Sequence, residues 1–120
     1  MIPRLIKNCA AETSRGKKFF QLEIADSFFA RLKGLMGRKK LPQGQGLLIL
    51  PCNSIHMLFM RFSIDAVYVD KNFVVKKIVR NLRPWLGISI CPGAHAVIEL
   101  NAGDAENFSL EVGSKIIFSQ

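Results

Sequence analysis

Ile64-Asp-Ala-Val-Tyr-Val-Asp-Lys-Asn-Phe-Val-Val-Lys-Lys-Ile-Val-Arg80 is the stretch that predicts the fold most directly. Its two halves, Ile64–Val69 and Phe73–Arg80, are rich in β-branched and aromatic residues, which favour extended backbone. The short segment Asp70-Lys-Asn lies between them and contains typical turn formers. The stretch therefore predicts two antiparallel strands joined in a β-hairpin.

Strand patterns continue on both sides of this hairpin. In residues 18–25 the apolar Phe20, Leu22 and Ile24 alternate with polar neighbours, which is the period of a half-buried strand. Further strands are expected at Leu47–Leu50, Ile55–Met60, Ala94–Leu100 and Lys115–Phe118. The long connection 81–93 contains prolines and glycines, and long loops in small domains often have a function.

One main helix is expected at about residues 26–36. Asp26 is a candidate N-cap and Gly37 a candidate stop. Between them the apolar side chains recur at helical spacing, at Phe28, Phe29, Leu32, Leu35 and Met36. Many short strands with one helix predict a mainly β fold, either a β-sandwich or an open barrel of mostly antiparallel strands, with the helix packed against it.

Composition predicts one ordinary globular domain over residues 1–120. Apolar residues make up 49% and charged residues 22%, which excludes a disordered chain. No apolar run approaches the roughly 18 residues of a membrane helix. The first residues lack the features of a signal peptide, so we expect a cytoplasmic location and three free thiols. The net charge of +8 makes this a small basic protein, suited either to anionic partners or simply to solubility.

A doubled Cys-x-x-x-His pattern suggests zinc as one interpretation of the cysteines. Cys52 and His56 form the first pair, and Cys91 and His95 form the second. Two thiolates and two imidazoles are a usual tetrahedral zinc set. Residues four apart on a strand lie about 13 Å from each other, so each pair would need a turn between its ligands. We therefore favour the alternative, partly buried thiols and hydrogen-bonding histidines without a metal or other cofactor.

Asp65 and Glu99 are the candidate catalytic residues, because each shares one face of its predicted strand with apolar residues and so points toward a core or a cleft. Paired carboxylates in a cleft would allow acid–base or glycosidase-like chemistry. The alternative is a structural ion pair that braces the sheet, and we favour it. A Cys–His nucleophilic pair using Cys52 or Cys91 is the weakest enzyme hypothesis, because neither cysteine lies in a known signature.

Basic residues cluster at 15–18, 31–40 and 76–83, which raises the hypothesis of nucleic-acid binding. Such modules interleave aromatic residues with positive charge so that bases can stack. Here most phenylalanines lie in apolar runs, and only Trp85 is placed in a basic loop, beside Arg83. We therefore treat nucleic-acid binding as possible in principle but not favoured.

An ordered set of short motifs resembles a known family. The motifs are Gly34-Leu-Met-Gly-Arg38, Gly46-Leu-Leu-Ile-Leu50, Ile55-His-Met-Leu-Phe-Met-Arg-Phe-Ser-Ile-Asp65, Asn81-Leu-Arg-Pro-Trp85, Glu99-Leu-Asn-Ala-Gly103 and Val112-Gly-Ser-Lys-Ile116. The set is similar to the prokaryotic domain of unknown function 192 family, also called uncharacterised protein family 0127, over about residues 19–118. The resemblance implies a small, mainly β domain and carries no established activity. Asp65 and Glu99 match aspartate and glutamate positions of the family motifs, whereas His56 lies where many relatives have a different segment.

The sequence lacks a catalytic motif, so we favour a non-catalytic binding module for a small polar ligand or a protein partner. The expected polar groove is lined by Asn53, His56, Arg61, Asp65, Trp85 and Glu99. The alternatives are a carboxylate-dependent enzyme acting on a saccharide-like or phosphorylated substrate and a basic protein associated with nucleic acid.

Overall fold

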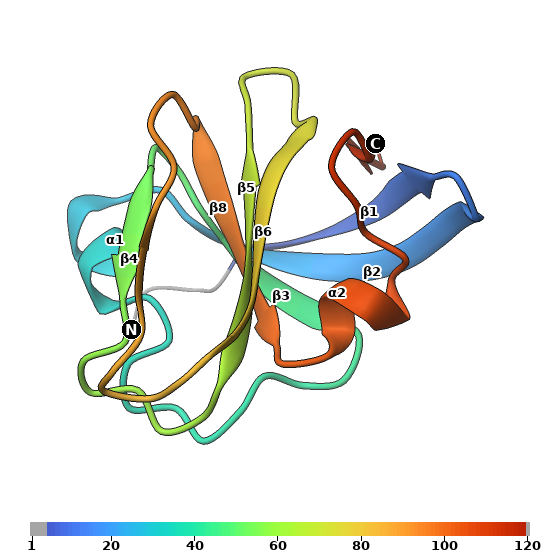
Figure 1. Cartoon of the computed structure of the whole chain (residues 1–120). Coiled ribbons are helices and arrows are strands. Elements are labelled where there is room, and N and C mark those ends of the chain that lie inside the picture. The colour runs from blue at the N-terminus through green and yellow to red at the C-terminus, as the bar shows by residue number, and fades with distance from the viewer. Residues whose placement is uncertain (1–4, 120) are drawn as a thin grey trace.

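The computed structural model describes residues 5–119, in which strands dominate (Figure 1). The strands are β1 (Ile6–Thr13), β2 (Gly16–Ala25), β3 (Gln45–Ile49), β4 (Ser54–His56), β5 (Ile64–Val69), β6 (Val75–Leu82), β7 (Ile88–Ile90), β8 (Ala96–Asn101) and β9 (Lys115–Phe118). The helices are α1 (Phe28–Lys33) and α2 (Asp104–Asn107). The main sheet has the order β6-β5-β8-β3-β2-β1-β9, and β4 pairs with β7 in a small second sheet.

The main sheet curls into a half-barrel. In Figure 1 β5 and β6 run vertically, whereas β1 and β2 cross the picture nearly horizontally. The curl brings β9, at one edge of the sheet, close to β6, at the other edge. Two hydrogen bonds join these edges: the Val75 amide donates to the Ser114 carbonyl at 2.8 Å, and the Ile116 amide donates to the Phe73 carbonyl at 2.9 Å. All strand pairs are antiparallel except β2 and β3. The prediction of a mainly β fold, either a β-sandwich or an open barrel of mostly antiparallel strands, is confirmed, and the half-barrel corresponds to the second of these architectures.

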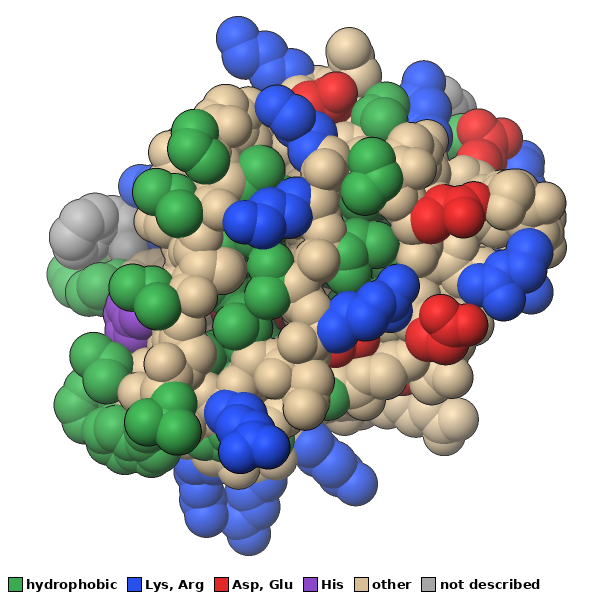
Figure 2. Space-filling model, viewed as in Figure 1, with side chains coloured by type: hydrophobic (Ala, Val, Ile, Leu, Met, Phe, Trp, Pro, Cys, Tyr) green, Lys and Arg blue, Asp and Glu red, His purple; other side chains and the backbone are tan. Residues whose placement is uncertain are grey.

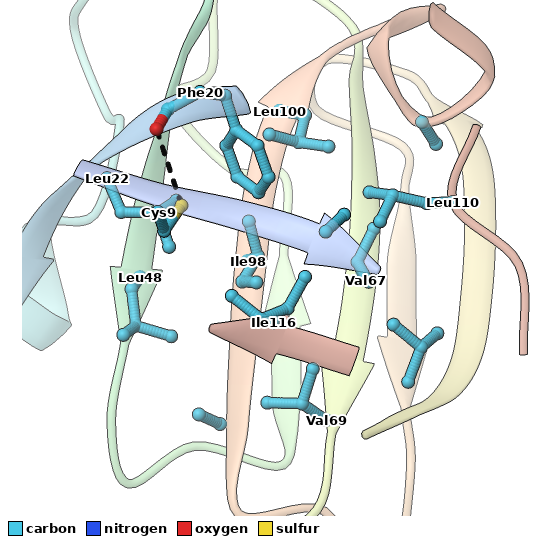
Figure 3. Packing of buried hydrophobic residues seen from close by; sticks show 14 residues of the cluster. Cys9, Phe20, Leu22, Leu48, Val67, Val69, Ile98, Leu100, Leu110 and Ile116 are labelled. Atoms are coloured by element: carbon cyan, nitrogen blue, oxygen red, sulfur yellow. Dashed lines mark hydrogen bonds between the residues drawn. The ribbon is translucent and has the colours of Figure 1, made fainter. Parts of the chain in front are cut away.

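Two hydrophobic clusters lie on the two faces of the central strands. Figure 3 shows the first cluster, in which Phe20, Leu48, Val67 and Ile98 pack together with residues from β1 and β9. The second cluster includes Leu47, Tyr68 and Val97 and lies on the side of α1 and the small sheet. Because β3, β5 and β8 are covered on both faces, all or nearly all of their residues are buried, and apolar side chains occupy both faces of each strand. The buried polar exceptions on these strands are Gln45, Asp65 and Glu99.

The helix at 26–36 is shorter than the sequence pattern predicts. Its N-cap is Ser27, whose Oγ accepts from the Ala30 amide at 3.2 Å, and Gly34 ends it with a positive φ of 49°. Beyond Gly34 the chain continues in turns, and Leu35 is buried there without being helical. None of the helices in the described part of the chain has the length and apolar character needed to span a bilayer.

The predicted strand Ile55–Met60 is also shorter than expected, since β4 ends at His56. The next residues turn back, with the Met60 amide donating to the Met57 carbonyl at 3.2 Å. Phe59 has a positive φ of 64°, which no strand residue adopts. Phe59 and Arg61 therefore lie in the loop after β4 and not on a strand.

Candidate functional site

Glu99 is a buried carboxylate in the middle of the main sheet. It lies on β8, opposite Leu47 of β3 and Ala66 of β5, and its residue is only 4% exposed. Its Oε1 has no hydrogen-bond partner among residues 5–119. Burial raises the pKa of Glu99 from 4.5 to about 7, although the nearby Arg38 guanidinium lowers it. The Oε1 atom of Glu99 is thus a buried hydrogen-bond acceptor without a partner in the described chain, and such an atom lowers the stability of the fold.

Glu99 lines a pocket of about 200 Å³. The other walls come from the end of α1 and the turn after it, from Ile49, and from the segment around β4. Besides Glu99, the lining residues with ionisable or hydroxyl side chains are Arg31, Lys33, Cys52, Ser54 and His56. The pocket is smaller than the roughly 300–1,000 Å³ of sites for drug-sized molecules, so it suits a small ligand.

Gly34 keeps the space above Glu99 open. A Cβ built on Gly34 would lie 3.3 Å from Glu99 Oε1, closer than most contacts of a real Cβ. Gly34 also has φ 49° and ψ −128°, a conformation that side-chain-bearing residues rarely adopt. Gly34 therefore has two roles. It adopts the backbone conformation that ends α1, and its missing side chain leaves space beside Glu99.

Arg31 supplies a second buried polar group without a partner. Its Nη1 donates to the Pro51 carbonyl at 3.3 Å, whereas its Nε is buried with no partner in the described chain. The neighbouring Arg38 is used differently, because its Nη2 forms an ion pair with Glu23 at 2.6 Å. Two residues that line the pocket, Glu99 and Arg31, therefore each have one buried polar atom without a partner in the described chain.

Cys52 and His56 both line the pocket but do not form an activated pair. The Cys52 thiol donates to the Ser54 carbonyl at 3.1 Å, and His56 Nδ1 accepts from the Leu58 amide at 3.2 Å. Burial raises the pKa of Cys52, and the Glu99 charge raises it further, while the Ser54 hydrogen bond and Arg31 lower it. Because the net shift is upward, the thiol stays protonated near neutral pH, unlike a nucleophilic cysteine.

Asp65 lies on the opposite face of the sheet from Glu99. Its carboxylate accepts from the backbone amides of Asn81, Gly103 and Ala105 at 2.9, 3.0 and 3.1 Å. These bonds hold the N-terminus of α2 against β5 and the end of β6. Asp65 and Glu99 therefore do not flank a common site, and a groove lined by both is not formed. The hydrogen-bond partners of the Asp65 carboxylate are backbone amides, where a structural ion pair with a basic side chain was expected.

The other predicted groove residues are dispersed. Asn53 is exposed, and its carbonyl accepts from the Cys91 amide at 2.8 Å. Arg61 is exposed in the loop after β4. Trp85 is 55% exposed, and its ring lies 4.9 Å from the ring of Phe59. Of the six predicted groove residues, the pocket brings together only His56 and Glu99.

The doubled Cys/His pattern is also divided in the structure. Cys52 and His56 line the pocket, Cys91 is buried in the second cluster, and the His95 ring contacts Phe73 at 6.1 Å. Within residues 5–119 no three His, Cys, Asp or Glu side chains are grouped as a metal site requires. The cysteines in this range are free thiols.

The chain is thus a small curled-sheet domain with a buried glutamate that lines a pocket. Residues 10–118 match the model of the DUF192 family, described as "Uncharacterized ACR". The chain belongs to this family, which confirms the resemblance inferred from its motifs. The family description names no activity, and the activity of the chain is therefore argued from its own site.

Relatives and solved structures agree with this assignment. A UPF0127 protein of Pyrococcus horikoshii is 39% identical over 101 residues, covering 80% of this chain and 85% of the relative. Another from Pyrococcus furiosus is 32% identical over 109 residues, covering 86% and 91%.

Two crystal structures have the same fold. A protein of unknown function from Novosphingobium aromaticivorans matches with a TM-score of 0.84 and 26% identity, over 92% of this chain and 84% of that chain. A protein from Sinorhizobium meliloti, provisionally described as a transcription regulator, matches with a TM-score of 0.90 over 98% and 97%. Its identity to this chain is 19%, so that likeness shows the fold alone.

Sequence reasoning did not find Arg31 and Gly34 as pocket residues. Arg31 belongs to a run of basic residues and has no spacing that marks it out. Gly34 was visible in the sequence as part of the Gly-Leu-Met-Gly motif, and a glycine just after a helical stripe is also a usual helix end. Only the position of Glu99 beneath it shows why the missing side chain matters.

Proposed function

We propose that the chain is a non-catalytic binding module for a small polar molecule that offers an N–H donor and an oxygen acceptor. This is the pairing found in an amide or a free amino acid. The N–H group would bind Glu99, and the oxygen would bind Arg31. The observation that carries the proposal is the unpaired Oε1 of a 4%-exposed glutamate at the wall of a pocket.

The energetic argument starts from the two unpaired groups. A buried polar group without a partner costs about 1–3 kcal/mol, and more if it is charged. Glu99 Oε1 and Arg31 Nε are both buried without a partner from the described chain, so a ligand that enters the pocket can supply one to each. A molecule that pairs with both groups at once would recover two such costs, which favours one with a donor and an acceptor.

The same contacts argue against a catalytic role. The carboxylates Asp65 and Glu99 project from opposite faces of the sheet, which removes the geometric basis for paired-carboxylate chemistry. Cys52 carries a raised pKa instead of the lowered one that a nucleophile needs. Binding without reaction is therefore the function that these groups support best.

The experiment is an NMR titration of ¹⁵N-labelled protein at pH 7.5. The probes are the common free amino acids and acetamide, with acetate and methylammonium as probes that have only one of the two groups. We expect saturable shifts in the amides of Gly34, Ile49 and Cys52 with at least one donor–acceptor probe. The single-group probes should bind more weakly, because each leaves one protein group unpaired.

Two variants make the result specific. Glu99→Gln should weaken binding about tenfold or more, because the amide nitrogen of Gln opposes the N–H donor of the ligand. Glu12→Gln is the control for the loss of one carboxylate charge, because Glu12 lies outside the pocket and its ion pair with Lys17 is on the surface. The proposal fails if no probe shifts these amides, or if Glu99→Gln binds as well as the unchanged protein.

A further inference from the structure

Two neighbouring loops present large apolar side chains to solvent. Leu58 and Phe59 follow β4 and are 46% and 60% exposed, while Trp85 and Leu86 precede β7 and are 55% and 79% exposed. We call these four residues the apolar tip. Figure 2 shows hydrophobic side chains gathered at the lower left, over the loops that follow β4 and precede β7. Contiguous exposed apolar side chains mark interaction surfaces more often than isolated ones do.

The apolar tip is held in place by the backbone. The Trp85 amide donates to the Met57 carbonyl at 2.7 Å, and the Met57 amide donates to the Gly87 carbonyl at 2.9 Å. These bonds join the two loops, and the Phe59 and Trp85 rings contact each other at 4.9 Å. The exposed side chains therefore belong to one ordered structure.

Both aromatic residues of the tip have strained backbone. Phe59 has φ 64° and Trp85 has φ 68°, in the left-handed region that bulky residues avoid. Each such residue reduces stability, and strained residues cluster at functional sites. Here the two strained residues carry aromatic rings that are largely exposed to solvent. Exposed rings contribute less to the free energy of folding than buried ones.

The charge around the tip is strongly positive. Residues 27–64 contain six Lys or Arg and no Asp or Glu, and residues 71–98 contain five Lys or Arg and no Asp or Glu. Arg61 and Arg83 are exposed beside the tip in the sequence. The Gly37 amide donates to the Phe59 carbonyl at 3.2 Å, which brings the basic turn with Lys39 and Lys40 to the same end. Figure 2 shows Lys and Arg side chains directly beside the apolar group.

We infer that the apolar tip docks on an anionic lipid bilayer, with its side chains in the interfacial layer and the surrounding Lys and Arg against the headgroups. Trp prefers the membrane interface, and apolar side chains with basic neighbours are the usual combination for interfacial binding. Leucine side chains fit acyl chains but cannot stack on bases, which disfavours nucleic acid as the occupant. This inference does not depend on the ligand pocket.

The test uses Trp85, the only tryptophan of the chain. Its fluorescence is measured with vesicles of phosphatidylcholine mixed with phosphatidylglycerol and with vesicles of phosphatidylcholine alone, and binding is confirmed by vesicle sedimentation. We expect a blue shift and sedimentation with the anionic vesicles, both reduced at high salt. Pure phosphatidylcholine should bind much less, because it offers no net charge to the basic residues.

Variants separate the apolar and charged contributions. The double variant Leu58→Ser with Leu86→Ser should lower the partition coefficient about tenfold or more, and Arg61→Gln with Arg83→Gln should lower it by a similar factor. Phe19→Ser with Val112→Ser is the matched control, because these residues are 75% and 67% exposed outside the tip, and it should bind as before. Circular dichroism checks that each variant is folded.

Three results would overturn the inference. One is no binding to anionic vesicles. Another is binding that the tip variants leave unchanged. The third is binding of single-stranded nucleic acid through the tip without vesicle binding, which would assign the surface to a different class of partner.

Discussion

Asp65 and Glu99 lie on adjacent strands but project from opposite faces of the sheet. Asp65 is opposite Leu100 in the β5–β8 register, and Glu99 is opposite the next residue, Ala66. Because neighbouring residues on a strand alternate between faces, this offset of one position gives the two carboxylates different surroundings. Asp65 is fully engaged with three backbone amides, whereas Glu99 Oε1 has no partner in the described chain. The Asp65 carboxylate thus stabilises the fold through its hydrogen bonds, whereas Glu99 lines the pocket.

Replacing Asp65 should destabilise the fold. Asp65→Ala leaves three backbone amides without their acceptor, so we expect the free energy of unfolding to fall by about 3 kcal/mol or more. Urea denaturation followed by circular dichroism measures this change. A loss below about 1 kcal/mol, within the range of an ordinary surface substitution, would show that the three hydrogen bonds do not hold α2 to the sheet.

Glu99→Gln should change how stability depends on pH. Because the pKa of Glu99 is raised from 4.5 to about 7, native Glu99 keeps its proton over this window while the unfolded chain loses it. Stability of the unchanged protein should therefore decline as pH rises from 4.5 to 7, by about 3 kcal/mol from this group. Glu99→Gln removes that decline. The free energy of unfolding of the variant, minus that of the unchanged protein, should therefore increase as the pH rises from 4 to 8.

Urea denaturation at both pH values gives this difference directly. The other carboxylates are common to the two proteins, so their contributions cancel in the comparison. A stability difference that stays constant from pH 4 to pH 8 would mean that Glu99 ionises normally, and it would remove the main reason to regard it as a buried, unpaired group.

Cys52 should react slowly with iodoacetamide at pH 8, because its pKa is raised. Glu99→Gln should speed alkylation of Cys52 several-fold, since the neutral side chain no longer opposes the thiolate. Mass spectrometry of the peptide that contains Cys52 measures the rate. Alkylation faster than that of a free thiol in solution would instead indicate an activated nucleophile and would favour an enzyme.

Phe59 tests the backbone strain in the apolar tip. Both Phe59→Gly and Phe59→Ala remove the ring, but only glycine adopts φ 64° without strain. We therefore expect Phe59→Gly to be about 1 kcal/mol more stable than Phe59→Ala, the reverse of the usual order in strands and helices. Equal stabilities, measured by urea denaturation, would mean that the loop relaxes and stores no strain at this residue.

Much of the sheet could be predicted from local patterns. Ile64–Val69 and Phe73–Arg80 pair as the predicted hairpin, with β6 starting two residues later, at Val75. Strand β1 was not predicted, because Ile6–Thr13 alternates only weakly, with three consecutive buried residues in its centre. Its strand state depends on pairing with β2 and β9, which local sequence does not encode.

The site was harder to predict because it depends on register and on turns. The alternation on each strand indicated which neighbours Asp65 and Glu99 would have, but no local feature fixed the offset between the two strands. Gly34 and Arg31 reach Glu99 through a short helix and a turn, so their proximity comes from tertiary packing. Glu99 was identified as a candidate, and its partners were not.

The most direct test of the binding function is native mass spectrometry of untagged protein purified from its own organism. We predict that the unchanged protein and the control Glu12→Gln carry a small molecule with an amine or amide group, which is released on denaturation. Glu99→Gln should be isolated without it. Unchanged protein that carries no small molecule, or a Glu99→Gln variant that carries the same one, would contradict the proposal that Glu99 is the centre of a ligand site.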